Sequence, residues 1–130
     1  MAAVLVIDAS VAVRLVTNSC GQADWADQLE RAALVIAPEL MLTEVANALW
    51  KLQRSNALNT MDPQALLADA RQLVDAIEPD RTLQVEALAL ACHLNHPVYD
   101  CLYLALARRE AAALLTADQK LRHLASQTLP

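Results

Sequence analysis

The sequence predicts a helix-rich α/β fold built around a short parallel sheet. The apolar run Val4–Ile7 is typical of a strand buried on both faces, because it lacks polar alternation. Similar short runs recur between longer segments with helical spacing, and this alternation indicates strand–helix–strand units with the sheet between helical layers. Gly21 is the only glycine among 130 residues, so few tight turns are available and helices must dominate.

The elements follow from local signals taken in chain order. Asp24 is a suitable N-cap for the second helix, and Pro38 ends the second strand. Asp62 and Pro63 favour a helix start, with aspartate at the N-cap and proline in the first turn. The expected strands are residues 4–7, 34–37, 77–79 and 113–116, and the expected helices are residues 10–16, 24–31, 39–54, 63–76, 81–95, 99–110 and 118–126.

Length and composition limit the number of domains and the classes of protein to which the chain can belong. We expect one domain over residues 1–130, with a substantial core. The chain is 56% hydrophobic, yet no apolar run approaches the roughly 18–20 residues that a membrane span needs. The opening residues do not resemble a signal peptide, so we expect a cytoplasmic protein without a membrane partner. Cys20, Cys92 and Cys101 show no metal-binding spacing and are expected as free thiols, the last two in the core.

The net charge of −5 argues against passive, electrostatically driven binding of nucleic acid. It does not exclude a nuclease, because bound divalent cations would neutralise part of the charge and a local basic rim could hold phosphates. Most basic residues, taken singly, are better explained as solvated helix faces. The candidates for such a rim are Arg14, Lys51, Arg54, Arg108, Arg109, Lys120 and Arg122.

Four acids occupy similar positions relative to the predicted elements. Asp8 closes the first strand, and Glu44 lies one turn into the helix after the second strand. Asp100 starts a helix, and Asp118 follows the last strand. Strand ends and helix starts fall on one edge of a parallel sheet, so we expect four separate segments to deliver four carboxylates to one place. Carboxylate oxygens without nearby His or Cys favour Mg²⁺ or Mn²⁺ over zinc.

Each acid also has a simpler interpretation. Asp100 and Asp118 could serve only as helix N-caps. Glu44 could pair with Arg54 or Arg14, or face solvent. Asp8 is the hardest to explain without a site, because an acid that closes a buried strand needs compensation. The order and context of the four acids, more than any one of them, indicate a metal site.

The chain resembles PIN-domain ribonucleases, and most closely the VapC toxins of bacterial VapBC toxin–antitoxin systems. The resemblance rests on four stretches that match in order and together span most of the chain, each with its acid in the expected place. These stretches are residues 6–11 (VIDASV), 38–49 (PELMLTEVANAL), 98–107 (VYDCLYLALA) and 115–121 (LTADQKL).

This resemblance implies a three-layer α/β/α sandwich and a Mg²⁺-dependent endoribonuclease, with Mn²⁺ as a substitute. It implies that Asp8 and Asp100 are the principal metal ligands and that Glu44 and Asp118 complete the acidic site. Ser10 and Thr116 match hydroxyls that line such sites, and each could equally be a cap or strand-end residue. The resemblance also implies a homodimer and a VapB-type antitoxin that blocks the site and alone carries operator DNA binding.

Other interpretations compete with this one. A catalytically silent PIN-like module could act by binding RNA or a partner protein, although the presence of all four acids disfavours it. A haloacid-dehalogenase-like phosphatase would need an aspartate where Ser10 stands, and a receiver-like domain fits poorly as well. Gln127 to Leu129 offers only a stub of a final strand that many relatives have. Trp50 is best explained by core packing, with a dimer or antitoxin groove as the alternative, and the three histidines by structural roles.

Overall fold

The computed structural model of the chain describes residues 3–19 and 24–130. Its centre is a four-stranded sheet in the order β3-β2-β1-β4, and every neighbouring pair is parallel. The predicted α/β fold with a short parallel sheet is therefore confirmed. The strands are β1 (Val4–Ile7), β2 (Leu34–Pro38), β3 (Ala76–Glu78) and β4 (Ala113–Leu115).

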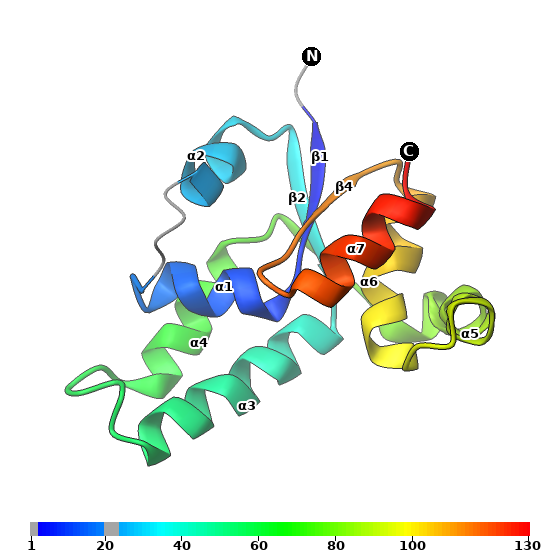
Figure 1. The fold of residues 1–130 in the computed structure, drawn as a ribbon. Coiled ribbons are helices and arrows are strands. Elements are labelled where there is room, and N and C mark those ends of the chain that lie inside the picture. Colours follow the sequence, from blue (N-terminus) through cyan, green and yellow to red (C-terminus); the bar gives the residue numbers. More distant parts are fainter. Residues whose placement is uncertain (1–2, 20–23) are drawn as a thin grey trace.

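Helices fill the rest of the fold (Figure 1). Helix α6 packs against β1, β2 and β4, and α5 and α7 pack against α6. Helices α1, α3 and α4 pack against one another and form the other group. The helices are α1 (Ala9–Val16), α2 (Asp24–Arg31), α3 (Leu40–Arg54), α4 (Pro63–Gln72), the 3₁₀ helix η1 (Asp80–Thr82), α5 (Gln84–Leu94), α6 (Val98–Arg109) and α7 (Gln119–Thr128).

The strand order fixes where a site can form. β1 lies between β2 and β4, so the chain leaves β1 toward one side of the sheet and later returns to its other side. Ligands of open α/β sheets bind beyond the carboxyl ends of the strands at such a reversal point. Helix α1 begins directly below the end of β1 in Figure 1, and α3 begins below the end of β2.

Most predicted boundaries hold to within a residue or two, with three exceptions. Helix α4 ends at Gln72, four residues before the expected end. The helix expected at 81–95 is divided into η1 and α5 around Leu83, which is buried. The possible strand stub at the C-terminus is wrong, because α7 continues to Thr128 with Leu121 and Leu124 in the core. The expected break at 18–21 lies partly outside the described residues.

Asparagine occupies most of the described left-handed backbone positions, where glycine is usually common. Four asparagines among the described residues adopt the left-handed conformation, which their short polar side chain tolerates. One of them, Asn95, ends α5 with φ 52° and directs the chain into His96 and Pro97. Ala111 also has a positive φ of 50°, directly after Glu110, the C-cap of α6, where glycine would be expected. The other three asparagines are Asn18, Asn56 and Asn59.

The core forms around α6, whose side chains from Cys101 to Ala107 are all buried. Two expectations about the core are wrong. Cys92 is exposed, because it lies on the outer face of α5, which also carries the exposed Val85 and Leu88. Trp50 is 50% exposed, and the guanidinium carbon of Arg54 lies 4.6 Å from the centre of its ring. The expected thiol Cys20 lies outside the described residues.

Candidate active site

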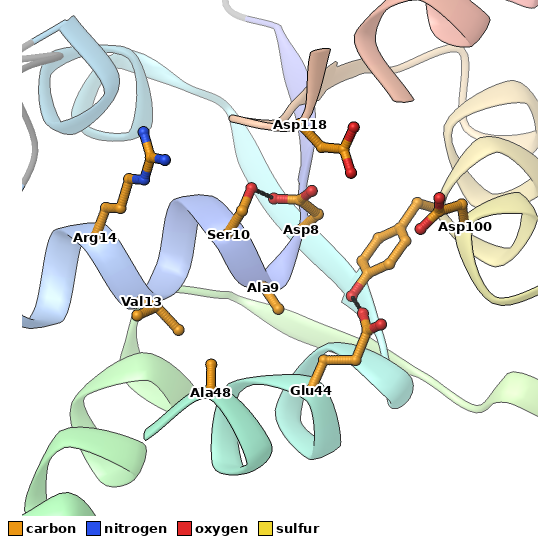
Figure 2. A pocket seen from close by; sticks show the side chains of 10 residues that line it. Asp8, Ala9, Ser10, Val13, Arg14, Glu44, Ala48, Asp100 and Asp118 are labelled. Atoms are coloured by element: carbon orange, nitrogen blue, oxygen red, sulfur yellow. Dashed lines mark hydrogen bonds between the residues drawn. The ribbon is translucent and has the colours of Figure 1, made fainter. Parts of the chain in front are cut away.

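The four acids singled out from the sequence line one pocket of about 330 Å³. Asp8 follows β1, Glu44 projects from α3, Asp100 from α6, and Asp118 precedes α7. Figure 2 shows Asp8 near the middle, with the other three acids arranged beside it. The structure brings these four segments together as predicted. For Asp8, Glu44 and Asp118 this follows from parallel strands that end at one edge of the sheet, whereas Asp100 comes from α6, which follows helix α5. The other lining residues are Ala9, Ser10, Val13, Arg14, Ala48 and Tyr103.

Asp8 is the most enclosed of the four carboxyl groups, with 5% of the residue exposed. It is the N-cap of α1, and its Oδ1 accepts hydrogen bonds from Ser10 Oγ (2.6 Å) and from the Val11 backbone N–H (3.1 Å). Its Oδ2 accepts from Thr116 Oγ1 (2.5 Å). Both of its oxygens are therefore held in place by the protein.

Ser10 and Thr116 also connect the ends of β1 and β4. Ser10 Oγ accepts from the Ala117 backbone N–H (2.9 Å), and Thr116 Oγ1 accepts from the Asp118 backbone N–H (3.0 Å). The two hydroxyls therefore fix Asp8 and the turn before Asp118 in one network. The sequence left open whether they line the site or serve as cap and strand-end residues, and this network gives them a positioning role beside Asp8.

Glu44 is held by a residue that the sequence analysis did not select. The phenolic hydroxyl of Tyr103 donates a 2.5 Å hydrogen bond to Glu44 Oε1. The ion pair of Glu44 with Arg54 or Arg14, which the sequence left open, is not present in the described part of the chain. Glu44 is partly buried and reaches the pocket from α3 (Figure 2), so the solvent-facing interpretation is also wrong.

Asp100 also has an unexpected partner. His96 is 8% exposed, and its Nε2 lies 2.7 Å from Asp100 Oδ2. The left-handed cap at Asn95 and the following Pro97 direct the imidazole back toward the first turn of α6. The structural role expected for His96 is therefore combined with contact to a site residue. His96 lies four residues before Asp100 in the connector between α5 and α6, so its proximity in sequence was the one signal that could have drawn attention to it.

Asp118 is a true N-cap as well as a pocket residue. Its Oδ1 accepts hydrogen bonds from the backbone N–H groups of Lys120 (2.8 Å) and Leu121 (3.1 Å). Arg122 Nη2 donates to the Thr116 backbone carbonyl (2.8 Å), which anchors α7 to the end of β4. The carboxyl group of Asp118 is exposed at the pocket edge, so the capping interpretation and the site interpretation are compatible.

The electrostatics of the pocket favour added positive charge. Burial raises the pKa of Asp8, and the hydrogen bonds from Ser10 and Thr116 only partly offset this increase. Burial also raises the pKa of Glu44, and the negative charge of Asp100 raises both values further. Over residues 3–19 and 24–130, no lysine or arginine forms an ion pair with any of the four acids.

The donor set suits a hard divalent cation. In the described ranges no three His, Cys, Asp or Glu side chains are arranged as a formed metal site. Mg²⁺ does not require such a group, because it keeps several of its waters and commonly binds through one or two carboxylates. Within the described residues, the oxygens Glu44 Oε2 and Asp100 Oδ1 accept no protein hydrogen bond, so they are available as ligands.

A profile of the PIN domain family matches residues 5–127. The chain belongs to the PIN domain family. This PIN domain is 32% identical over 123 residues to Ribonuclease VapC3 of Pyrobaculum aerophilum, a match that covers 90% of the chain and 91% of that protein. It is also 32% identical over 117 residues to Ribonuclease VapC9 of Mycobacterium tuberculosis, with coverages of 90% and 87%. The resemblance to VapC proteins found in the sequence is thus confirmed.

The crystal structure of PAE2754 from Pyrobaculum aerophilum has the same fold as this PIN domain. It matches with a TM-score of 0.72 over 95% of this chain and 86% of that chain, at 22% sequence identity. Among the described residues, no helix has the length and apolar character needed to cross a membrane.

Proposed function

We propose that this PIN domain is the toxin of a type II toxin–antitoxin system of the VapBC type, an endoribonuclease that hydrolyses RNA phosphodiester bonds with Mg²⁺ or Mn²⁺. The names of its relatives support the ribonuclease activity. The observation that carries the proposal is the pocket itself, in which four carboxyl groups from four elements gather with no lysine or arginine pairing with them in the described residues.

Asp8 and Asp100 are the principal metal ligands in this proposal, and Glu44 and Asp118 complete the site directly or through water. When bound, the cation would supply an activated water and stabilise the leaving oxygen of the phosphodiester. Ser10 and Thr116 hold Asp8 in one orientation, so that it does not need to reorganise during the reaction. Tyr103 does the same for Glu44.

The pocket also contains a group that suits a phosphate. Arg14 is the one basic residue among the described residues that line it, and it projects from α1 on the side of Asp8 away from Asp100 (Figure 2). An arginine can bind a phosphate oxygen through two parallel hydrogen bonds. We therefore assign Arg14 to a phosphate of the RNA backbone next to the scissile one. The four acids would hold the cation at the scissile phosphate.

The proposal includes the partners of such a toxin. A VapB-type antitoxin would cover or enter the acid pocket, and the toxin would bind operator DNA only through that antitoxin. We further propose that the chain forms a homodimer and acts in the cytoplasm. Co-purification of the chain with the product of a small neighbouring gene, followed by loss of RNA cleavage in that complex, would test the partnership.

The alternative is a catalytically silent module that binds RNA or protein. Cleavage itself separates the two, because a silent module leaves the RNA intact. Metal dependence and product chemistry then test the mechanism. The purified, antitoxin-free chain is incubated with total RNA in Mg²⁺, in Mn²⁺ and in EDTA, and the ends of the products are determined. Water-mediated hydrolysis leaves no 2′,3′-cyclic phosphate, whereas attack by the neighbouring 2′-hydroxyl does. Metal-dependent cleavage without cyclic ends supports the proposal. Intact RNA in every condition, cleavage in EDTA or cyclic ends would contradict it.

A further inference from the structure

A second hollow continues from the acid pocket along α3. It has a volume of about 540 Å³ and shares Glu44 and Ala48 with the acid pocket, so the two hollows lie next to each other. We call this extension the Tyr99 groove. Its lining residues are Leu40, Thr43, Glu44, Asn47, Ala48 and Lys51 of α3, and Tyr99 of α6.

Tyr99 stands out because of its exposure. It is 66% exposed, whereas Tyr103, one turn later on the same helix, is 1% exposed. Tyr99 also directly precedes the site residue Asp100. The core therefore does not account for the ring of Tyr99, which contributes an aromatic face to the wall of a groove beside the four acids.

The opposite wall of the groove is polar and carries one cation. Thr43, Asn47 and Lys51 follow one another at four-residue spacing, so they share a face of α3. Lys51 forms no ion pair with any described residue. Lys51 therefore adds a positive charge beside the acidic pocket that no described carboxylate neutralises through an ion pair.

We propose that the Tyr99 groove binds a nucleotide of single-stranded RNA next to the scissile phosphate. This inference rests on the proposed ribonuclease function. Tyr99 stacks on the base, Lys51 binds the adjacent phosphate, and Asn47 hydrogen-bonds to the edge of the base. Proteins that bind single strands combine aromatic stacking with a positive groove in this way. An unpaired strand is required, because bases within a helix are already stacked.

The lining of a neighbouring hollow argues against a protein occupant in the Tyr99 groove. Between α3 and α4, a more apolar hollow is lined by Leu49, Trp50, Pro63 and Leu67, among others. A partner helix or strand would find its apolar contacts there. The Tyr99 groove instead offers one aromatic ring, a cation and hydrogen-bonding side chains, which match the base, phosphate and edge of a nucleotide.

The test measures binding separately from cleavage. A short, fluorescein-labelled single-stranded RNA of mixed sequence is titrated with the chain in Mg²⁺, over a series of salt concentrations. All proteins carry Asp8→Asn, which on the proposed mechanism leaves the RNA intact. We expect Tyr99→Ala to weaken binding about tenfold and Tyr99→Phe to stay within about twofold, because phenylalanine keeps the stacking face. The logarithm of the RNA association constant falls linearly with the logarithm of the salt concentration. Lys51→Gln should make this slope shallower by about 0.7, because one phosphate contact is lost.

The matched control lies on the same helix. Trp50 and Arg54 are also an exposed aromatic residue and a cation, but they line no part of the groove. Trp50→Ala and Arg54→Gln should leave RNA affinity unchanged. Equal losses in the control pair, unchanged affinity in Tyr99→Ala, or no binding by the parent protein would overturn the inference. A loss of antitoxin affinity in Tyr99→Ala with RNA affinity intact would overturn it too, by making the groove a protein site.

The two proposals can fail separately. If the chain with Asp8 intact cleaves RNA and the groove variants bind normally, the subsite is wrong and the ribonuclease function stands. If the groove variants lose affinity as expected but the chain with Asp8 intact never cleaves RNA, the subsite stands and the silent RNA-binding module replaces the nuclease.

Discussion

Nε2 of His96 lies 2.7 Å from Oδ2 of Asp100, across one turn at the start of α6. An ionised carboxylate can only accept hydrogen bonds, so the imidazole N–H is the donor in that state. Asp100 lines the pocket where we propose that a cation binds, and its Oδ1 accepts no hydrogen bond from the described residues. His96 is therefore a positioning residue, acting on the metal through Asp100.

Replacement of His96 should weaken metal binding while leaving the fold intact. Loss of an outer hydrogen-bond partner of a metal ligand commonly reduces affinity 10–100-fold. We expect His96→Ala to reduce Mn²⁺ affinity roughly tenfold or more, measured by calorimetry, and His96→Gln to retain part of it because glutamine keeps a donor. His93→Ala, an exposed histidine on α5, is the control. Unchanged Mn²⁺ affinity in His96→Ala would show that the contact is only structural.

Tyr103 should influence the reaction through Glu44. Its hydrogen bond lowers the pKa of Glu44, against the larger increase caused by burial. Tyr103→Phe removes the donor, so Glu44 becomes protonated at a higher pH and the acid limb of the pH–rate profile moves upward. We expect cleavage near neutral pH to fall about tenfold, mainly in kcat. Glu44→Gln should remove the contribution of Glu44 to this limb and leave that of Asp8, whose pKa is also raised. An unshifted profile in Tyr103→Phe would separate Glu44 from catalysis.

Asp8 should destabilise the metal-free fold at neutral pH. Its pKa in the folded chain is raised above the ordinary value of 3.8, mainly by burial. The folded state therefore holds the proton more tightly than the unfolded state. The stability gained from that proton is complete below pH 3.8 and is lost as the pH rises through the raised pKa. Neutral pH is thus the condition in which the buried charge costs most.

Asp8→Asn removes this cost and keeps the helix cap. In EDTA at pH 7 we expect the variant to be more stable by about 1 kcal/mol, or roughly 4 °C in Tm, with the difference vanishing in acid. Thermal unfolding across the pH range measures this. Asp62→Asn makes the same change at the exposed N-cap of α4 and should have no such effect. A destabilised Asp8→Asn at neutral pH would mean that its hydrogen bonds outweigh the burial of charge.

Ala111 provides a test of the fold that is independent of the site. Its φ of 50° is costly for a residue with a Cβ, and glycine adopts it freely. Ala111→Gly should stabilise the chain by about 0.5–1 kcal/mol, measured by urea unfolding. Ala112→Gly at the next position, which is buried, should instead destabilise it. Stabilisation by both substitutions, or by neither, would contradict this explanation.

The sequence predicted the elements and the convergence of Asp8, Glu44, Asp100 and Asp118 because both follow from chain order. Apolar runs mark the strands, and a parallel sheet places every strand end at one edge. At Asp118 the capping and site interpretations do not exclude each other, since the same side chain caps α7 and lines the pocket.

The partners of the acids were harder to predict. Tyr103 contacts Glu44 across 59 positions in the chain, a pairing that depends on where the fold places α3 and α6 relative to each other. His96 was close in sequence to Asp100, but its direction depends on the left-handed Asn95. Trp50 and Cys92 were wrongly predicted to lie in the core. Apolar character alone does not say which face of a helix packs against the core, and both residues are exposed.

The central claim is that the four acids act together as a metal-dependent ribonuclease site. Its most direct test is RNA cleavage in Mg²⁺ by the unmodified chain, Asp8→Asn, Asp100→Asn and the Asp62→Asn control, purified in parallel. We predict metal-dependent cleavage by the unmodified chain and the control, and a loss of about 100-fold or more in both site variants. Cleavage that survives in both site variants, or a folded, metal-binding chain that cuts no RNA, would contradict the claim.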